Sequence, residues 1–117
     1  MKDYIKKIPN EPLFKQNGLN GYKFNLENKD IGIVIEDCFK GHDKYTINKV
    51  TTHIYYVLEG EGTFCINEEK YSVKKDDVIE IPPNTEFVFA GKMKLLLINT
   101  PDFKPENNTD TKENDLY

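Results

Sequence analysis

The chain has 117 residues, of which 38% are hydrophobic and 31% charged, and its formal net charge is −4 at pH 7. This length fits one domain with one core. Acidic and basic residues alternate along most of the chain, so we expect no basic face for nucleic acid. No apolar run approaches the roughly 18 residues of a membrane-spanning helix. The first seven residues lack the apolar core of a signal peptide, which predicts a cytoplasmic protein.

The first 20 residues are expected to form an extended arm. Pro9 and Pro12 lie close together, and proline removes a backbone donor that a helix requires. We therefore expect the arm to lie against the rest of the domain or against a partner subunit. It carries scattered apolar residues at Ile5, Ile8, Leu13 and Phe14.

Short β-strands separated by frequent turns are predicted from residue 21 to residue 102. Residues 22–26 alternate in polarity, residues 31–38 are rich in β-branched side chains, and residues 51–67 form two strands around a turn bounded by Gly60 and Gly62. Further strands are expected at 45–50, 70–73, 78–81, 86–89 and 93–99. Because no segment has helical periodicity, an antiparallel sandwich or barrel is predicted.

The composition changes after the last predicted strand. Residues 105–115 are polar and charged, with little that could be buried. Such a segment predicts a mobile tail. The predicted organisation is therefore an extended arm over 1–20, a β-barrel domain over 21–102 and a disordered polar tail over 103–117.

Gly41 and Gly60 frame a first segment that includes residues 54–62, and Pro82, Asn84 and Gly91 lie in a second. The two segments resemble the two motifs of the cupin family, whose members are small jelly-roll β-barrels. Gly41 and Gly60 occupy the two glycine positions of the first motif, and residues 54–62 are close to the sequence that is commonest in the family. Pro82 matches the second motif, Gly91 falls on its final asparagine position, and Asn84 replaces a glycine and can adopt a left-handed backbone. The resemblance covers about residues 31–99. It implies an all-β fold, an antiparallel cupin jelly-roll β-barrel, also called a double-stranded β-helix.

The same motifs depart from the family at the metal ligands. Most cupins hold a divalent metal with three histidines and one glutamate, and here those positions are Ile47, Lys49, His53 and Phe87. A single imidazole does not hold such a metal against water, and a cationic Lys49 would repel it. The other histidine, His42, lies in a loop before the motif. The sequence therefore predicts no metal and no cofactor. A non-standard metal set of His53 with Glu80 or Glu86 remains as an alternative.

Strand alternation predicts which side chains line a pocket. If His53 points into the barrel, so does Tyr55, and Lys49 is expected to follow the same parity. Lys49 would then either extend its ammonium group to the barrel mouth or pair with an acid such as Glu80 or Glu86. The remaining predicted lining residues are Tyr45 at the mouth and Ile47, Phe87 and Phe89 as apolar wall.

A histidine, a tyrosine and a lysine around an apolar cavity form an acid–base set. His53 is the candidate base, Tyr55 the candidate acid and Lys49 the candidate anion anchor. Some metal-free members of the cupin family are sugar-nucleotide epimerases and ketoisomerases that use His and Tyr in this way. The resemblance therefore implies a metal-independent isomerase, epimerase or lyase acting on a small polar, carbohydrate-like or anionic ligand.

Two non-catalytic explanations stay open. His53 and Tyr55 can both be hydrogen-bonded core residues, and the pocket can belong to a non-catalytic binding or sensing module. In every case a homodimer is expected, because cupin barrels usually pair through a sheet face or through exchanged N-terminal strands.

Overall fold

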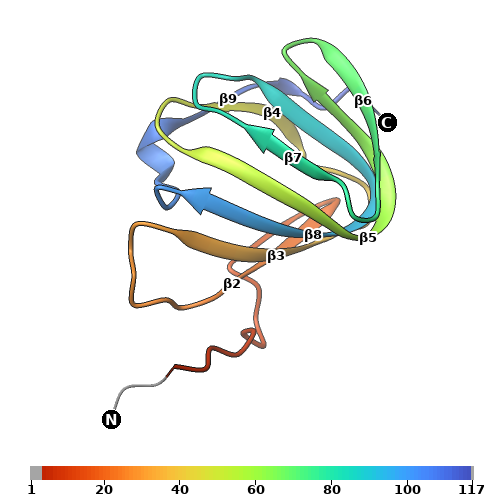
Figure 1. Ribbon diagram of the computed structural model, residues 1–117. Helices are drawn as coiled ribbons and strands as arrows, with labels where there is room; N and C mark the ends of the chain where they lie inside the picture. Colours follow the sequence, from red (N-terminus) through yellow and green to blue (C-terminus); the bar gives the residue numbers. More distant parts are fainter. Residues whose placement is uncertain (1–3, 117) are drawn as a thin grey trace.

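The computed structural model describes residues 4–116 as one strongly curled antiparallel β-structure (Figure 1). Its described residues form no α-helix, and no helix among them is long and apolar enough to cross a membrane. The all-β cupin-type fold expected from the sequence is therefore confirmed. The elements are β1 (Phe14–Gln16), β2 (Leu19–Lys23), β3 (Gly32–Cys38), β4 (Lys44–Asn48), β5 (Thr52–Ile66), β6 (Glu69–Lys74), β7 (Val78–Ile81), β8 (Phe87–Thr100), the 3-10 turn η1 (Pro105–Asn107) and β9 (Asn108–Glu113).

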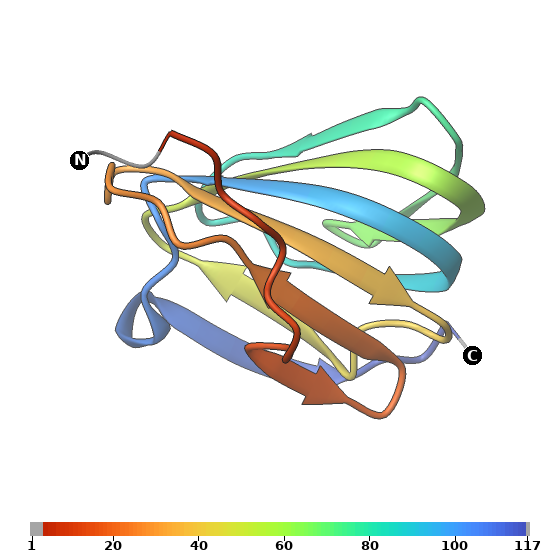
Figure 2. The ribbon, with the colours of Figure 1, turned by 90° about the horizontal axis from the view of Figure 1, so that it is seen from below.

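Two long strands, β5 and β8, hold the two ends of the barrel together. They pair with each other over nearly their whole length, from Thr52↔Thr100 to Ile66↔Phe87. One end of β8 also pairs with β3 and the other with β4, whereas β5 also pairs with β6 and β7. Because both strands bend midway, their halves belong to different walls of the barrel, as the view from below shows (Figure 2).

Glycines allow this bend. Gly62 and Gly91 face each other across β5 and β8, and a side chain on either would collide with the backbone of the opposite strand. Gly60 and Gly91 also have positive φ values of 87° and 133°, which favour glycine. Asn84, expected to adopt a left-handed backbone in place of glycine, does so with a φ of 61°.

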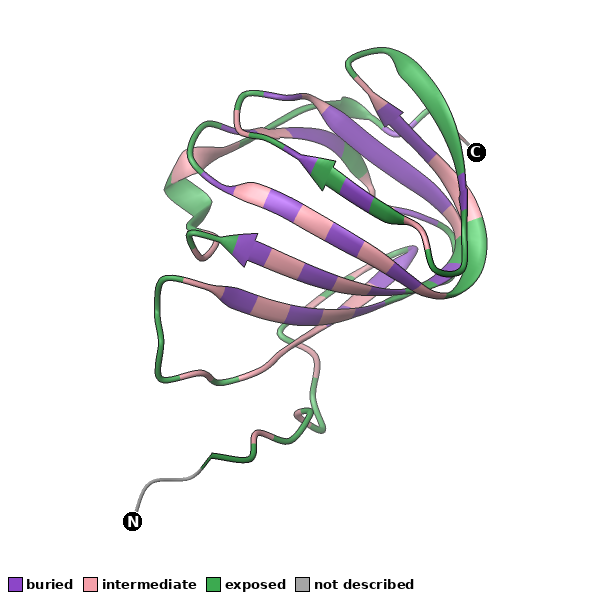
Figure 3. Ribbon diagram, viewed as in Figure 1, coloured by how far each residue is buried: buried purple, intermediate pink, exposed green. Residues whose placement is uncertain are grey.

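The core fills the barrel between these walls. Inward residues of β5 and β8 alternate with half-exposed ones along each strand (Figure 3). Phe64 and Phe89 stack with their ring centroids 4.9 Å apart, and Tyr55 meets both rings edge-on. This aromatic cluster blocks one end of the barrel, so open space remains only toward the other end.

The C-terminal segment differs from the disordered tail expected over 103–117. Asn108–Glu113 forms β9, which pairs antiparallel with β4. The segment buries little apolar surface, but its backbone completes the ladder of β4, and the buried Asn114 side chain donates to the carbonyls of His42 and Phe89. Backbone pairing rather than hydrophobic burial orders this segment, which explains why composition did not reveal it. Tyr117 lies outside the described residues.

The N-terminal segment agrees with the expected arm only in part. Residues 4–13 have no regular structure, but β1 and the start of β2 lie within the predicted arm, so the boundary at residue 20 cuts through β2. The Phe14 ring lies over Gly21, where any larger residue would collide with it. Met1–Asp3 lie outside the described residues.

Candidate functional site

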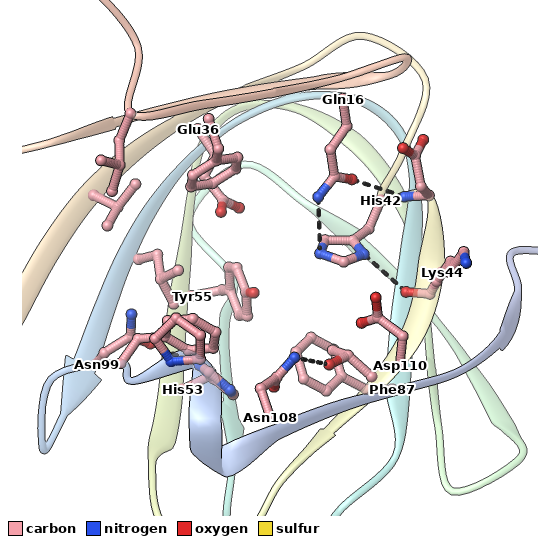
Figure 4. A pocket seen from close by; sticks show the side chains of 18 of the residues that line it. Gln16, Glu36, His42, Lys44, His53, Tyr55, Phe87, Asn99, Asn108 and Asp110 are labelled. Atoms are coloured by element: carbon pink, nitrogen blue, oxygen red, sulfur yellow. Dashed lines mark hydrogen bonds between the residues drawn. The ribbon is translucent and has the colours of Figure 1, made fainter.

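A cavity of about 660 Å³ opens inside the barrel (Figure 4). One wall is the inner face of β3, β8 and β5. The opposite wall comes from β4, β9 and the loop before β4, and β1 closes one side. The polar side chains that line it include Gln16, Glu36, His42, His53, Tyr55, Asn99, Asn108 and Asp110.

His53 presents a bare ring nitrogen to this cavity. Its Nδ1 lies 2.6 Å from the amide oxygen of Asn99, the residue paired with it on β8. Because that oxygen accepts, Nδ1 carries the proton and Nε2 keeps its lone pair. Nε2 is buried and has no hydrogen-bond partner among residues 4–116. Burial lowers the pKa of His53, against a smaller opposite effect of Asn99, so the neutral imidazole is a ready proton acceptor.

His42 also lines the cavity, from the loop before β4. Its Nδ1 donates to the Lys44 carbonyl at 2.8 Å, and the Gln16 amide donates to its Nε2 at 3.5 Å. Burial lowers the pKa of His42 as well. Sequence reasoning set His42 aside as a loop residue. Its backbone N–H bonds to the carbonyl of Phe89, which turns the loop inward, and its place directly after Gly41 of the first motif was the available signal.

Glu36 is the acidic group of the inner sheet face. It is only 3% exposed, its Oε1 has no hydrogen-bond partner in the described part of the chain, and burial raises its pKa to about 8. Sequence reasoning treated residues 31–38 as a uniformly buried strand and did not single it out. The signal was its parity, because Glu36 shares the inward face of β3 with Val34 and Cys38.

Tyr55 stands in the aromatic middle of the cavity wall. Its ring centroid lies 6.0 Å from that of Phe87 and 6.4 Å from that of His53. Burial raises its pKa well above the ordinary value, and Glu36 adds to that effect. The phenol therefore keeps its proton and can donate a hydrogen bond but not readily become an anion. His53, Tyr55 and Phe87 are the sequence-predicted residues that the structure brings together here.

Lys49 does not face the cavity. It is exposed in the turn between β4 and β5, and its backbone N–H bonds to the Asn107 carbonyl. The predicted parity fails because residues 49–51 break the alternation between the two strands, so that Thr46 and not Ile47 lines the cavity. Ile47 lies half-buried outside it.

Four other predicted lining residues also lie elsewhere. Glu80 is exposed on the outer face, because it pairs with Ile54 rather than with His53. Glu86 accepts a hydrogen bond from Thr111 at the surface. Tyr45 is buried against Cys65 and donates to Asp115 at 2.6 Å, and Phe89 belongs to the core below the cavity.

The donor set does not fit the usual cupin metal. Among residues 4–116, no three His, Cys, Asp or Glu side chains lie close enough together to hold an ion. The alternative set of His53 with Glu80 is also not brought together, because the two side chains point to opposite faces of their sheet.

Known proteins resemble this chain in fold and, over part of its length, in sequence. A Streptomyces PAC13 variant with uridine is 25% identical, with a TM-score of 0.89 over 97% of this chain and 93% of that one. A structure of Pac13, called a unique nucleoside dehydratase, is 23% identical over 96% and 93% with the same TM-score. KdgF from Halomonas sp. is 14% identical, with a TM-score of 0.71 over 85% and 96%.

A relative by sequence is an uncharacterized protein of Methanocaldococcus jannaschii. It is 37% identical over 70 residues, which cover 56% of this chain and 53% of the relative. The chain thus spans about half the length of that protein. Residues 41–99 match the family described as "Cupin domain". This match takes in half of the chain and both glycine-bearing motifs, and it shows that the chain belongs to the cupin family.

Proposed function

We propose that this cupin is a lyase that acts on a small polar ligand of nucleoside size by acid–base catalysis with its own side chains. The observation that carries the proposal is the buried, unpartnered Nε2 of His53, which faces a cavity of about 660 Å³. A buried polar atom without a partner is costly. The position of such an atom at a cavity wall is explained if a bound ligand becomes its partner.

The similarity to Pac13 favours a nucleoside over other small polar ligands. Pac13 is called a nucleoside dehydratase, and its structures with uridine include a His-to-Gln variant and Tyr-to-Phe variants. The cavity here is lined by two histidines and one tyrosine. A dehydratase is a lyase, one of the three reaction classes that the sequence suggests. The anionic ligand suggested by Lys49 loses its support, because Lys49 lies outside the cavity.

The reaction needs a base and a proton donor. In a dehydration, the base takes a proton from carbon, that electron pair forms the C=C bond, and the departing hydroxyl takes a proton to leave as water. His53 Nε2, as neutral imidazole, is the proposed base. The Tyr55 hydroxyl, which keeps its own proton, is the proposed hydrogen-bond donor to the leaving oxygen. The imidazolium that His53 becomes gives its proton to that oxygen, so that water leaves and the neutral imidazole is regenerated. His42 is a second imidazole on the opposite wall, already oriented by Gln16 and the Lys44 carbonyl.

Substitution of His53 tests the proposal. Turnover is followed as water loss by mass spectrometry, over a panel of nucleosides and sugar derivatives. His53→Ala and His53→Gln are expected to abolish turnover, while the melting temperature of His53→Gln stays close to that of the wild type. Thr52→Ala, on the same strand but facing outward, is the matched control. Activity that survives in His53→Gln, or a large loss of stability with activity intact, would contradict the role of His53.

A non-catalytic binding module is the second candidate. It is favoured by the hydrogen bond from Gln16 that already occupies Nε2 of His42, because a histidine held at both nitrogens is suited to shaping a site rather than to moving protons. Under this alternative, wild type and His53→Gln both bind uridine by calorimetry, and neither converts any compound of the panel.

A further inference from the structure

Glu36 and His53 lie at opposite ends of the cavity wall. Glu36 pairs with Leu95 of β8, whereas Asn99 of β8 pairs with His53. Four residues along a strand correspond to about 13 Å, and the two strand spacings between β3 and β5 add about 10 Å across. In a flat sheet the two Cα atoms would thus be roughly 16 Å apart. Figure 4 shows Tyr55 between the two polar ends.

Glu36 lies in a setting without a counter-ion. Gly21 of β2 pairs with it, and the Phe14 ring covers that glycine. The two lysines that line the cavity are engaged elsewhere. Lys23 is bound to Asp102 at 2.7 Å, and Lys44 lies 3.9 Å from Glu113. A buried carboxyl group whose Oε1 makes no hydrogen bond lowers the stability of the protein. A ligand that bonds to this group would offset that loss.

We propose that Glu36 is a ligand anchor that works as an uncharged carboxyl group, and that it selects an uncharged nucleoside whose other end lies against His53. The inference rests on the proposed function for the ligand-binding cavity, but not on any catalytic step.

The length of the cavity supports the ligand class. Both side chains project from the inner face of the curled sheet, so their tips lie closer together than the roughly 16 Å that separates the two Cα atoms in a flat sheet. A sugar joined to a planar base fills such a span, whereas a single sugar ring is too short. Protonated Glu36 offers one O–H donor and one acceptor, and His53 Nε2 offers one acceptor.

Charge supports the choice of a nucleoside over a nucleotide. A phosphate would need an unpaired cation in the cavity, and Lys23 and Lys44 are already engaged. Burial raises the pKa of Glu36 to about 8, so the carboxyl group is mostly protonated at pH 7. Above pH 8 it is mostly ionised, and its negative charge would repel the phosphate of a nucleotide. The other titratable groups around the cavity are Lys23 on β2, Cys38 on β3, His42 and Asp43 before β4, Lys44 on β4, Tyr55 and His53 on β5, and Asp110 on β9.

Calorimetry with uridine and with uridine 5′-phosphate tests the anchor. Wild type is expected to bind uridine at least tenfold more tightly than the phosphate at pH 7. Glu36→Gln keeps a donor and an acceptor and should bind uridine within a few-fold of wild type, whereas Glu36→Ala should weaken binding about tenfold, as loss of one hydrogen bond predicts. Asp37→Asn makes the same chemical change on the outer face of β3 and should change nothing.

Infrared spectroscopy tests the uncharged state without any ligand. A band from a protonated carboxyl group is expected at pH 7 in wild type and in Asp37→Asn, and it should be missing in Glu36→Gln. Absence of this band from wild type would overturn the inference. Uridine binding that is equal in wild type and Glu36→Ala would also overturn it and leave the proposed function standing. If wild type binds neither compound while it converts a non-nucleoside of the panel, only the inference fails; if it also converts nothing, both fail.

Discussion

At the scale of single residues, burial favours the uncharged form of three titratable groups of the cavity, Glu36, His42 and His53. Burial lowers the pKa of His42 and His53 and raises the pKa of Glu36. The acid and the bases are therefore all neutral in the same pH range, which suits a site that exchanges protons or hydrogen bonds with an uncharged ligand. A site that binds an anionic ligand would instead require at least one basic side chain that is not already paired with an acid.

The raised pKa of Glu36 predicts how the free energy of unfolding depends on pH. The folded protein keeps the Glu36 proton up to about pH 8, whereas the unfolded chain loses it near the ordinary glutamate pKa of 4.5. Between these values the unfolded state binds fewer protons, so the Glu36 contribution lowers the free energy of unfolding as pH rises. The limiting slope is about 1.4 kcal/mol per pH unit. Below pH 4.5 the penalty is absent, and above pH 8 it is complete.

Urea unfolding of Glu36→Gln from pH 4.5 to pH 8 measures this contribution. The variant should gain stability relative to wild type steadily across this range, because glutamine does not ionise. Asp37→Asn corrects for the general effect of removing a carboxylate. A difference between Glu36→Gln and wild type that stays constant with pH would mean that Glu36 titrates as an ordinary carboxylate.

At the scale of elements, β9 connects the end of the chain to the site. Its residues Asn108 and Asp110 line the cavity. Beyond the strand, Asn114 donates to the carbonyl of His42 at 2.7 Å and to that of Phe89 at 3.0 Å. The same side chain accepts from the N–H of Leu116 at 2.9 Å. One buried amide therefore attaches the C-terminal segment to the loop that carries His42.

Asn114→Ala should destabilise the protein by about 1–3 kcal/mol, because it removes the two hydrogen bonds that the side chain donates. The Phe89 carbonyl keeps the backbone N–H of His42 as a donor. Amide hydrogen exchange should speed up first in β9 and in residues 42–44, since these lose their attachment directly. Thr109→Ala, an exposed change on β9, should stay within about 0.5 kcal/mol of wild type. Equal exchange rates in β9 of Asn114→Ala and wild type would show that the ladder with β4 holds the segment without Asn114.

The elements also show what the sequence could predict. The alternation of polar and apolar residues, together with the turn residues, was enough to predict the long hairpin. It also predicted the inward positions of His53 and Tyr55, because both lie on one uninterrupted strand. Lys49 was misplaced because residues 49–51 interrupt the alternation, and such a break leaves no mark on the hydrophobic pattern. Glu36 and His42 become neighbours of the cavity only through pairing with β2 and β8, and through the loop contact to Phe89. Long-range pairing of this kind cannot be seen along the chain.

At the scale of the whole molecule, the outer face of the sheet that carries the site is apolar. Side chains of five adjacent strands form a row across it, and a second row lies beside them. All but Val78 are half-buried, and Val78 is exposed. We call this surface the outer apolar face; it consists of Tyr22, Ile35, Leu96, Tyr56 and Val78 in the first row and Ile33, Ile98 and Ile54 in the second.

The homodimer expected from the sequence can use this face. Next to the first row, Asp37, Lys94 and Glu59 lie side by side on β3, β8 and β5. In a two-fold contact the same patch meets itself, so the lysine of one subunit would meet acids of the other around an apolar centre. Contiguous apolar surface rimmed by charges is typical of such interfaces. The N-terminal arm offers less apolar surface for a dimer contact, because Phe14 is already packed on the core of its own chain.

Leu96→Lys tests the dimer, because Leu96 lies in the middle of the first row and its side chain points away from the core. Wild type should scatter light as twice the chain mass of 13.6 kDa, and the variant should scatter as one chain. Its free energy of unfolding, measured at low concentration where both proteins are monomeric, should change by less than about 1 kcal/mol, since the site is only half-buried. Ser72→Lys, an exposed change on β6, is the matched control and should remain a dimer. A monomeric wild type would contradict the homodimer outright, whereas a dimer that persists in Leu96→Lys would shift the interface to the arm.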